Sequence, residues 1–510
     1  MVTHIDGHNL SIEQVHAVAR LGNQVALTDE ARRNVQRGRE LVEQLVASNV
    51  PIYGVTTGIG ELARIRVSQE QGEELQRRII YSHAASTGEV QPPEAVRAAM
   101  LCRANTLAKG YSGVRLESLD TYIEMLNRGV VPVVYEKGSV GTSGDLSPLS
   151  QLAMVLIGEG EAFFQGERLP GAEALKRAGL QPVRPSYKEG LGFINGAQMM
   201  TGESALILYD AERILKTALI AMAMTLDVLK AVGKAFHPLV HAHRPFPGQI
   251  TVARNLRRLF EGSEIMADPS GKVQDGYSMR CTPQVVGPSL DAFHYVRAQI
   301  ALELNSLSDN PVFFPDEKLY LAAGNFHAQS TAMAMDFLAI ALAEVASLSE
   351  RHTNRLLNPA LSGLPDFLVE GKGLNSGLMV AQYTQAALVS ENKVLCHPAV
   401  VDSISVSADQ EDHVNMGPVA VRKCREVLKN VAAVISVQLL CGAQALDFRK
   451  PKRPGKGVLA AYEVIRRRVP FMEHDRPLYP DIEQVLELVR SQEILDAVEN
   501  TIGPLELAGE

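Results

Sequence analysis

Apolar residues recur at helical spacing through most of the chain beyond residue 200, with few strand-like interruptions. Five segments carry this pattern and predict helices, several of them longer than usual: 205–234, 289–306, 331–357, 377–392 and 419–445. They are largely apolar and rich in small residues, which suits a bundle whose helices bury more than one face. The low charge along 331–347 also fits burial against other subunits.

The first 200 residues have a different pattern, in which short helical stretches alternate with turns and strand-like pieces at 51–55, 130–135 and 162–169. The sequence therefore predicts a mainly α-helical protein. A smaller mixed N-terminal domain spans residues 1–200, and a domain with a long central helix bundle spans residues 201–510.

Composition narrows the class of protein. Hydrophobic residues make up 46% of the 510 residues and charged residues 21%, as in a globular protein with ample core, and the net charge of −8 argues against nucleic-acid binding. Five scattered cysteines, no visible signal peptide and no apolar stretch long enough for a membrane span indicate a cytoplasmic protein that does not enter the membrane.

The segment 138–150 concentrates glycine and small hydroxyl residues between a strand-like run and a helix-like stretch. Its simplest interpretation is a turn followed by a helix whose first turn is capped by Asp145 or Ser147. At its centre, Thr142-Ser143-Gly144 places a β-hydroxyl directly before a glycine.

Other short motifs contain residues that bind ligands or move protons, and each also fits a structural role. Tyr53 precedes a glycine-rich loop, and His83 ends a helical stretch. A guanidinium suited to a carboxylate follows an amide and a phenol at 274–280, and two carboxylates precede a histidine at 410–413. The spacing of the histidines at 237, 241 and 243 resembles a metal site, but with no carboxylate or cysteine nearby it favours a surface loop, and we expect no metal.

Taken in order, these motifs resemble the histidine and aromatic amino-acid ammonia-lyases, and the resemblance covers nearly the whole chain. The matching positions are Tyr53, His83, the triplet Thr142-Ser143-Gly144, Asn195, Gln274, Tyr277, Arg280, Phe326 and Glu411. The stretches 373–377, 390–393, 397–398 and 401–403 are similar to the histidine branch in particular.

The resemblance implies a fumarase/aspartase-like helix bundle, a homotetramer with each active site built from three subunits, and a cofactor made from the chain itself. In that family the triplet cyclises autocatalytically to 4-methylidene-imidazol-5-one. The backbone nitrogen of Gly144 attacks the Thr142 carbonyl, and Ser143 loses water to leave a methylidene. Glycine allows the closest approach because it has no Cβ.

The resemblance also implies a role for each matching residue. Arg280 holds the substrate carboxylate, and Tyr53 removes the β-proton with support from Tyr277, which requires a depressed phenol pKa. Asn195, Gln274 and Phe326 orient the cofactor, and Asn195 and Gln274 also orient the substrate. His83 and Glu411 bind an imidazole ring. The implied reaction converts L-histidine to trans-urocanate and ammonia.

Four departures from the family pattern keep other activities open. Thr142 stands where the family usually has alanine, and Thr56 stands where it has asparagine. Ile59 replaces an aromatic residue, and Thr282 replaces glutamine. The alternatives are an aromatic amino-acid 2,3-aminomutase, a tyrosine or phenylalanine ammonia-lyase with the same cofactor, and a non-catalytic scaffold. Glu411 favours histidine, because a carboxylate would lie unpaired beside a phenyl ring.

Overall fold

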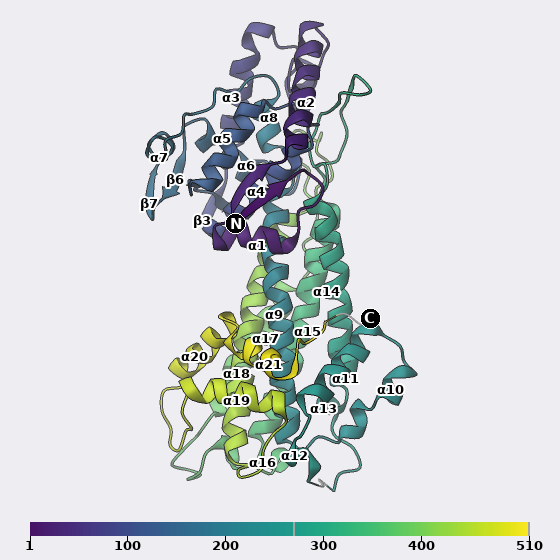
Figure 1. Cartoon of the computed structure of the whole chain (residues 1–510), viewed down its shortest axis with the longest axis vertical. Helices are drawn as coiled ribbons and strands as arrows, with labels where there is room; N and C mark the ends of the chain where they lie inside the picture. The colour runs from purple at the N-terminus through teal and green to yellow at the C-terminus, as the bar shows by residue number, and fades with distance from the viewer. Residues whose placement is uncertain (269–270, 508–510) are drawn as a thin grey trace. The chain divides into compact units, whose positions relative to one another are not determined.

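A computed structural model describes residues 1–268 and 271–507, and most of them are helical (Figure 1). They form two compact units. The first contains residues 1–209, 297–335 and 398–422; the second contains 210–296, 336–397 and the described residues from 423 on.

Four long helices belong partly to each unit: α9 (Gln198–Val228), α14 (Thr282–Leu304), α15 (Gln329–Leu357) and α18 (Gly417–Asp447). With α17 (Met379–Leu395) of the second unit, they correspond to the five predicted helices, and the mainly α class is confirmed. The expectation that no apolar stretch is long enough for a membrane span was wrong, because among the described residues α15 and α18 have the necessary length and composition. However, 67% and 78% of their most apolar windows are buried inside the protein, as in core helices.

The rest of the first unit combines shorter helices with small sheets. Its helices are α1 (Ile12–Leu21), α2 (Asp29–Ala47), η1 (Gly60–Arg64), η2 (Gln69–Gln71), α3 (Gly72–His83), α4 (Pro93–Ala108), α5 (Leu116–Asn127), α6 (Ser147–Leu156), α7 (Gly171–Arg177) and α8 (Glu189–Ile194). Its strands are β1 (Val2–Ile5), β2 (Gln24–Leu27), β3 (Thr87–Val90), β4 (Val131–Pro132), β5 (Tyr135–Lys137), β6 (Glu161–Phe164), β7 (Glu167–Pro170), β8 (Val312–Phe314) and β9 (Leu319–Leu321).

These strands pair in four small sheets. β1 and β2 are parallel, while β3–β5, β4–β6–β7 and β8–β9 are antiparallel. The predicted strand pieces at 130–135 and 162–169 therefore contain real strands.

The strand expected at 51–55 was wrong, because this segment is a turn. The hydroxyl of Thr56 accepts a hydrogen bond from the amide of Ile52 at 2.8 Å and donates one to the carbonyl of Val50 at 2.9 Å. Ile52 and Val55 are fully buried against Phe313 and the apolar face of α2. The turn is thus anchored on both sides of Tyr53.

Helices joined by loops make up the described residues of the second unit, which contain no strand. Besides its parts of the four long helices and α17, it contains η3 (Gly233–Phe236), α10 (Pro238–Ala242), α11 (Pro247–Leu259), α12 (Glu264–Ala267), α13 (Tyr277–Arg280), α16 (Pro359–Ser362), η4 (Asp366–Leu368), α19 (Lys456–Arg468), α20 (Tyr479–Arg490) and α21 (Glu493–Ile502). In Figure 1, α19 lies beside α21, against which it packs.

Candidate active site

The segment from Gly141 to Leu146 has an unusual backbone for non-glycine residues. Ser143 and Leu146 have positive φ values of 49° and 46°, and the φ values of Gly141 and Gly144 are also positive. L-residues rarely adopt this conformation, and such strain is concentrated at functional sites. A Cβ on Gly144 would come within 2.1 Å of the backbone of Gly196, so only glycine fits there.

Two backbone hydrogen bonds tie this loop to the turn between α8 and α9. The amide of Gly196 donates to the carbonyl of Ser143 at 2.9 Å, and the amide of Asp145 donates to the carbonyl of Gly196 at 2.7 Å. Since Asn195 directly precedes Gly196, the predicted cofactor loop and the predicted orienting residue lie side by side.

Asp145 caps a helix, but not the one that follows it. Its carboxylate accepts hydrogen bonds from the amides of Met199 at 2.6 Å and Met200 at 3.3 Å, at the start of α9. Complete burial raises the pKa of this carboxyl to about 8, although the two amides oppose the shift. Ser147 is hydrogen-bonded to Ser86 at 2.8 Å, so the expectation that either residue caps α6 was wrong.

A cavity with two parts opens beside the loop, and Tyr53, Gly60, Ser143 and Glu411 line both parts. The first part has a volume of about 300 Å³. Its lining also includes Ile59, Ser82, His83, Leu146, Leu191, Asn195 and Ser407. The second, of about 500 Å³, also touches Thr142, Asn310, Phe326, His327, Asp412 and His413. All of these residues belong to the first unit.

His83 is held in one tautomer. Its Nδ1 atom lies 2.8 Å from the carbonyl oxygen of Ile79, one turn earlier in α3. A carbonyl oxygen only accepts, so Nδ1 carries the proton, and Nε2 of the neutral ring is an acceptor.

Tyr53 lies in the same cavity, and its hydroxyl accepts a hydrogen bond from the amide of Gly60 at 2.9 Å. Burial raises the pKa of this phenol, as does the nearby charge of Glu411, while the amide bond opposes both effects. The direction is opposite to the depressed pKa expected of a base. Within this chain, Tyr53 is therefore a protonated phenol at neutral pH.

The loop around 405–411 presents Glu411 to the cavity. Val406 and Glu411 form a short antiparallel bridge, with the amide of Val406 donating to the carbonyl of Glu411 at 3.0 Å. The residues between them turn sharply, with positive φ at 407–409. The bridge leaves the carboxylate of Glu411 on the wall that it shares with Tyr53 and Ser143.

Gln274, Tyr277 and Arg280 form a separate cluster in the second unit. The guanidinium of Arg280 donates to the amide oxygen of Gln274 at 2.8 Å and lies 4.8 Å from the centre of the Tyr277 ring. The Tyr277 side chain is 74% exposed. None of the three lines the cavity formed by the described residues of the first unit.

The histidine-rich loop has a structural role at one position. His241 is buried, with Nε2 3.1 Å from the carbonyl of Ala235 and Nδ1 3.0 Å from the side-chain amide of Gln249. Both ring nitrogens are therefore occupied. Among residues 1–268 and 271–507, no group of three or more His, Cys, Asp or Glu side chains could hold a metal ion.

Comparisons with known proteins place these features in a family. The model of the aromatic amino acid lyase family matches residues 10–467. The chain belongs to this family. It is 51% identical to the histidine ammonia-lyase of Symbiobacterium thermophilum, over 98% of this chain and 99% of the relative. It is 52% identical to that of Gloeobacter violaceus, over 98% of each chain.

Solved structures extend the family likeness to the whole fold. Histidine ammonia-lyase from Trypanosoma cruzi superposes with a TM-score of 0.93 at 38% identity, covering 99% of this chain and 96% of that one. Tyrosine aminomutase from Streptomyces globisporus superposes with a TM-score of 0.94 at 37% identity, covering 98% and 99%. The resemblance inferred from the motifs and the lyase-type helix bundle are confirmed.

Some residues that line the cavity are not among those predicted from the sequence motifs. Asn310 lines the second part of the cavity, and Leu146 and Leu191 line the first. An Asp-Asn-Pro turn at 309–311 is visible in the sequence, but nothing in its pattern predicts that it meets a loop 165 residues earlier. The fully buried side chains of Lys188 and Asp309 were missed for the same reason.

Proposed function

We propose that this protein is a carbon–nitrogen lyase that eliminates ammonia from L-histidine to give trans-urocanate. The observation that carries the proposal is that Glu411 and the acceptor Nε2 of His83 share one cavity with Ser143. An imidazolium ring offers an N–H donor to each of two such acceptors, whereas a phenyl ring offers none.

The loop residues fit the cofactor of this family, 4-methylidene-imidazol-5-one formed from Thr142, Ser143 and Gly144. Only glycine fits at 144, and Ser143 is already held at positive φ in a strained turn. Such a ring supplies an electrophile that makes a substrate amine a better leaving group. The side chain of Thr142 does not take part in the ring closure, so threonine in place of alanine removes no reacting atom.

The remaining roles follow from the chemistry of the side chains. Tyr53 receives the β-proton, which requires its raised pKa to be offset by positive charge near the phenol. Arg280 of the partner subunit is the natural source of that charge, with Tyr277 and Gln274 beside it. It also pairs with the substrate carboxylate. Asn195 and Phe326 orient the groups around Ser143.

These roles require an assembly. Tyr277 and Gln274 are exposed, and neither they nor Arg280 line the cavity, so we infer a homotetramer in which three subunits complete each site. The substrate is a free amino acid in the cytoplasm, and neither nucleic acid nor membrane takes part.

A substrate panel tests the proposed activity. The purified protein is incubated separately with L-histidine, L-tyrosine and L-phenylalanine, and the products are identified by mass spectrometry, with Ser143→Ala as the control. We expect urocanate and ammonia from histidine only, and neither from the variant. A β-amino acid from tyrosine or phenylalanine would identify an aminomutase, and an arylacrylate from either would identify the other ammonia-lyases.

Intact mass tests the cofactor separately. Ring formation removes two waters, so the wild-type mass is expected to fall short of the sequence mass by that amount. A full-length mass with no loss would identify a scaffold that never forms the ring.

A further inference from the structure

A fully buried ion pair lies next to the cavity. The Nζ atom of Lys188 is 3.0 and 3.1 Å from the two carboxylate oxygens of Asp309, and both side chains are 0% exposed. Lys188 also has a positive φ of 71°, which is uncommon for a non-glycine residue. Burying two charges is costly, so a pair of this kind needs an explanation beyond stability.

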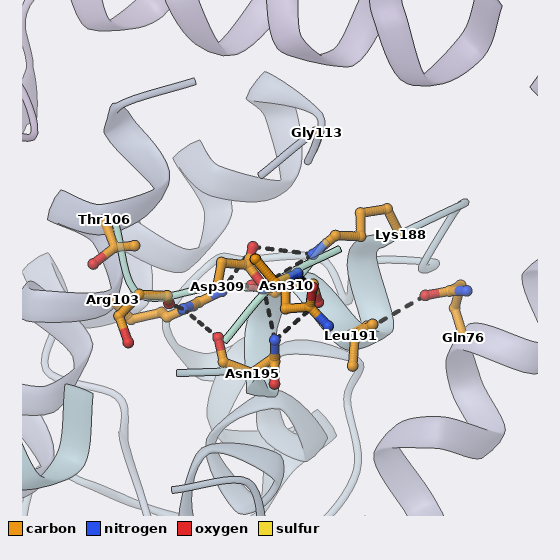
Figure 2. A network of polar contacts seen from close by, with 12 residues as sticks. Gln76, Arg103, Thr106, Gly113, Lys188, Leu191, Asn195, Asp309 and Asn310 are labelled. Atoms are coloured by element: carbon orange, nitrogen blue, oxygen red, sulfur yellow. Dashed lines mark hydrogen bonds and ion pairs between the residues drawn. The ribbon is translucent and has the colours of Figure 1, made fainter. Parts of the chain in front are cut away.

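The pair controls the amide of Asn195. The Nδ2 atom of Asn195 lies 3.2 Å from a carboxylate oxygen of Asp309 and 2.9 Å from the carbonyl oxygen of Asn310. Both neighbours only accept hydrogen bonds, so the atom that faces them must be the nitrogen. Both hydrogens of the Asn195 NH2 group are therefore donated to these two oxygens. Figure 2 shows Lys188, Asn195 and Arg103 converging on Asp309.

The backbone of Asn195 is fixed as well. Arg103, also fully buried, donates from Nη1 to the carbonyl oxygen of Asn195 at 2.8 Å and from Nη2 to that of Gly192. Because backbone and amide nitrogen are both held from the protein side, the amide oxygen of Asn195 remains for the cavity that this residue lines beside Ser143.

We propose that Lys188 and Asp309 are positioning residues that orient the Asn195 amide, so that an acceptor oxygen faces the amine of the substrate. The proposal rests on the proposed function and adds two residues to it. Lys188 binds both oxygens of the Asp309 carboxylate, and one of these oxygens accepts from Asn195. An ammonium group has only donors, so it is complementary to the oxygen and would be repelled by the NH2 group.

The substitution Asp309→Asn tests this orientation. Lys188 needs an acceptor and takes the one amide oxygen, so residue 309 turns its NH2 group toward Asn195. The Asn195 amide must then rotate and present its own NH2 group to the cavity. We expect kcat/KM for histidine to fall at least ten-fold, about the loss of one hydrogen bond to a charged group.

A comparison of two ligands separates this effect from general damage. Imidazolepropionate is histidine without its amine, so its inhibition constant is expected to change less than two-fold in Asp309→Asn. An equal loss for both ligands would overturn the proposal. The intact mass should still lack two waters, because the proposal gives the pair no part in ring formation.

A double-mutant cycle identifies the residue through which the pair acts. In an Asn195→Ala background, Asp309→Asn should change kcat/KM less than two-fold. The same loss with and without Asn195 would contradict the proposal. Lys109→Met is the matched control, since Lys109 is a buried lysine of the same unit that contacts His8 and lines neither part of the cavity. It should retain full activity.

If Asp309→Asn fails to fold, Lys188→Met/Asp309→Leu replaces it in both comparisons. Residue 309 then offers Asn195 no acceptor, so the Asn195 amide is no longer held in one orientation and the same results are expected. Removing both partners leaves no unpaired buried lysine, while Arg103, which lies 3.6 Å from Asp309, keeps its bonds to the carbonyl oxygens of Asn195 and Gly192. A wild-type protein that carries the ring but turns over tyrosine or phenylalanine instead of histidine would refute the proposed substrate alone. The cycle is then measured on that amino acid, with its amine-free analogue.

Discussion

Nδ1 of His83 lies 2.8 Å from the carbonyl oxygen of Ile79, which leaves Nε2 as the acceptor in the cavity. The same wall carries the carboxylate of Glu411, a second acceptor. A substrate ring that satisfies both must carry two N–H groups, as an imidazolium does. We propose that this pairing of acceptors favours histidine over phenylalanine.

Replacing Glu411 with glutamine should therefore weaken turnover of histidine. A hydrogen bond to a charged group contributes about 1.5–3 kcal/mol, so we expect kcat/KM to fall roughly 10- to 100-fold. Steady-state kinetics measure the change, and intact mass checks that the ring still forms. Asp409→Asn is the control, because Asp409 is an exposed carboxylate of the same loop that bonds Ser405. Unchanged kinetics in Glu411→Gln would remove the case for histidine.

Gly144→Ala should prevent ring formation. Its Cβ would meet Gly196 at 2.1 Å, in addition to the strain of a φ of 77°. Gly166→Ala separates the two effects, since Gly166 has a φ of 83° but no atom within 4 Å of an added Cβ.

Denaturant unfolding and intact mass measure the outcome. We expect Gly166→Ala to lower the free energy of unfolding by about 1–2 kcal/mol and to keep the ring. Gly144→Ala should be destabilised further and retain its two waters. Equal effects of the two substitutions would show that the contact with Gly196 is unimportant.

His352 should make stability depend on pH. It is buried on α15, with Nε2 2.6 Å from the carbonyl of Ser278 and Nδ1 3.2 Å from the amide of Gln438. Burial, and then the charge of Arg355, lower its pKa to about 4. The unfolded chain, with a pKa near 6.5, binds the proton more readily, so stability falls as the pH drops from about 6.5 to 4.

The expected loss is up to about 3 kcal/mol at the low end of this window. Urea unfolding at several pH values measures it in the wild type, in His352→Gln and in the control His474→Gln, whose histidine is exposed. The slope should be reduced only in His352→Gln. A slope shared by all three proteins would exclude His352 as its source. Because Ser278 lies within α13, the same bond also holds the turn that carries Tyr277 and Arg280.

Mixing two inactive variants tests the shared site. Ser143→Ala and Arg280→Ala should each be inactive alone. Co-expressed in equal amounts, they should recover about a quarter of the wild-type activity, because one site in four then pairs an intact Ser143 with an intact Arg280 from another chain. Ammonia release from the purified mixed tetramers measures the recovery. No recovery from mixed tetramers would place both residues in one chain's site.

Local patterns predicted some elements and missed others for identifiable reasons. The five long helices followed from apolar spacing that extends over many turns. The strand at 51–55 was wrong, because the hydroxyl of Thr56 bonds the backbone of Val50 and Ile52 and closes a turn. Asp145 was placed on the following helix, but its carboxylate reaches α9, a contact that its own neighbours do not indicate.

The sequence by itself determined the chemistry available to this protein: the triplet with its obligatory glycine, the phenol, the imidazole and the carboxylate, in the order of a known family. Tertiary structure decided how those groups are presented. The protonated state of Tyr53 depends partly on Glu411, and the orientation of the Asn195 amide depends on Asp309, whereas the tautomer of His83 is set by Ile79 within its own helix. Desolvation and the hydrogen bonds between residues far apart in the sequence act through space, so spacing along the chain does not reveal them.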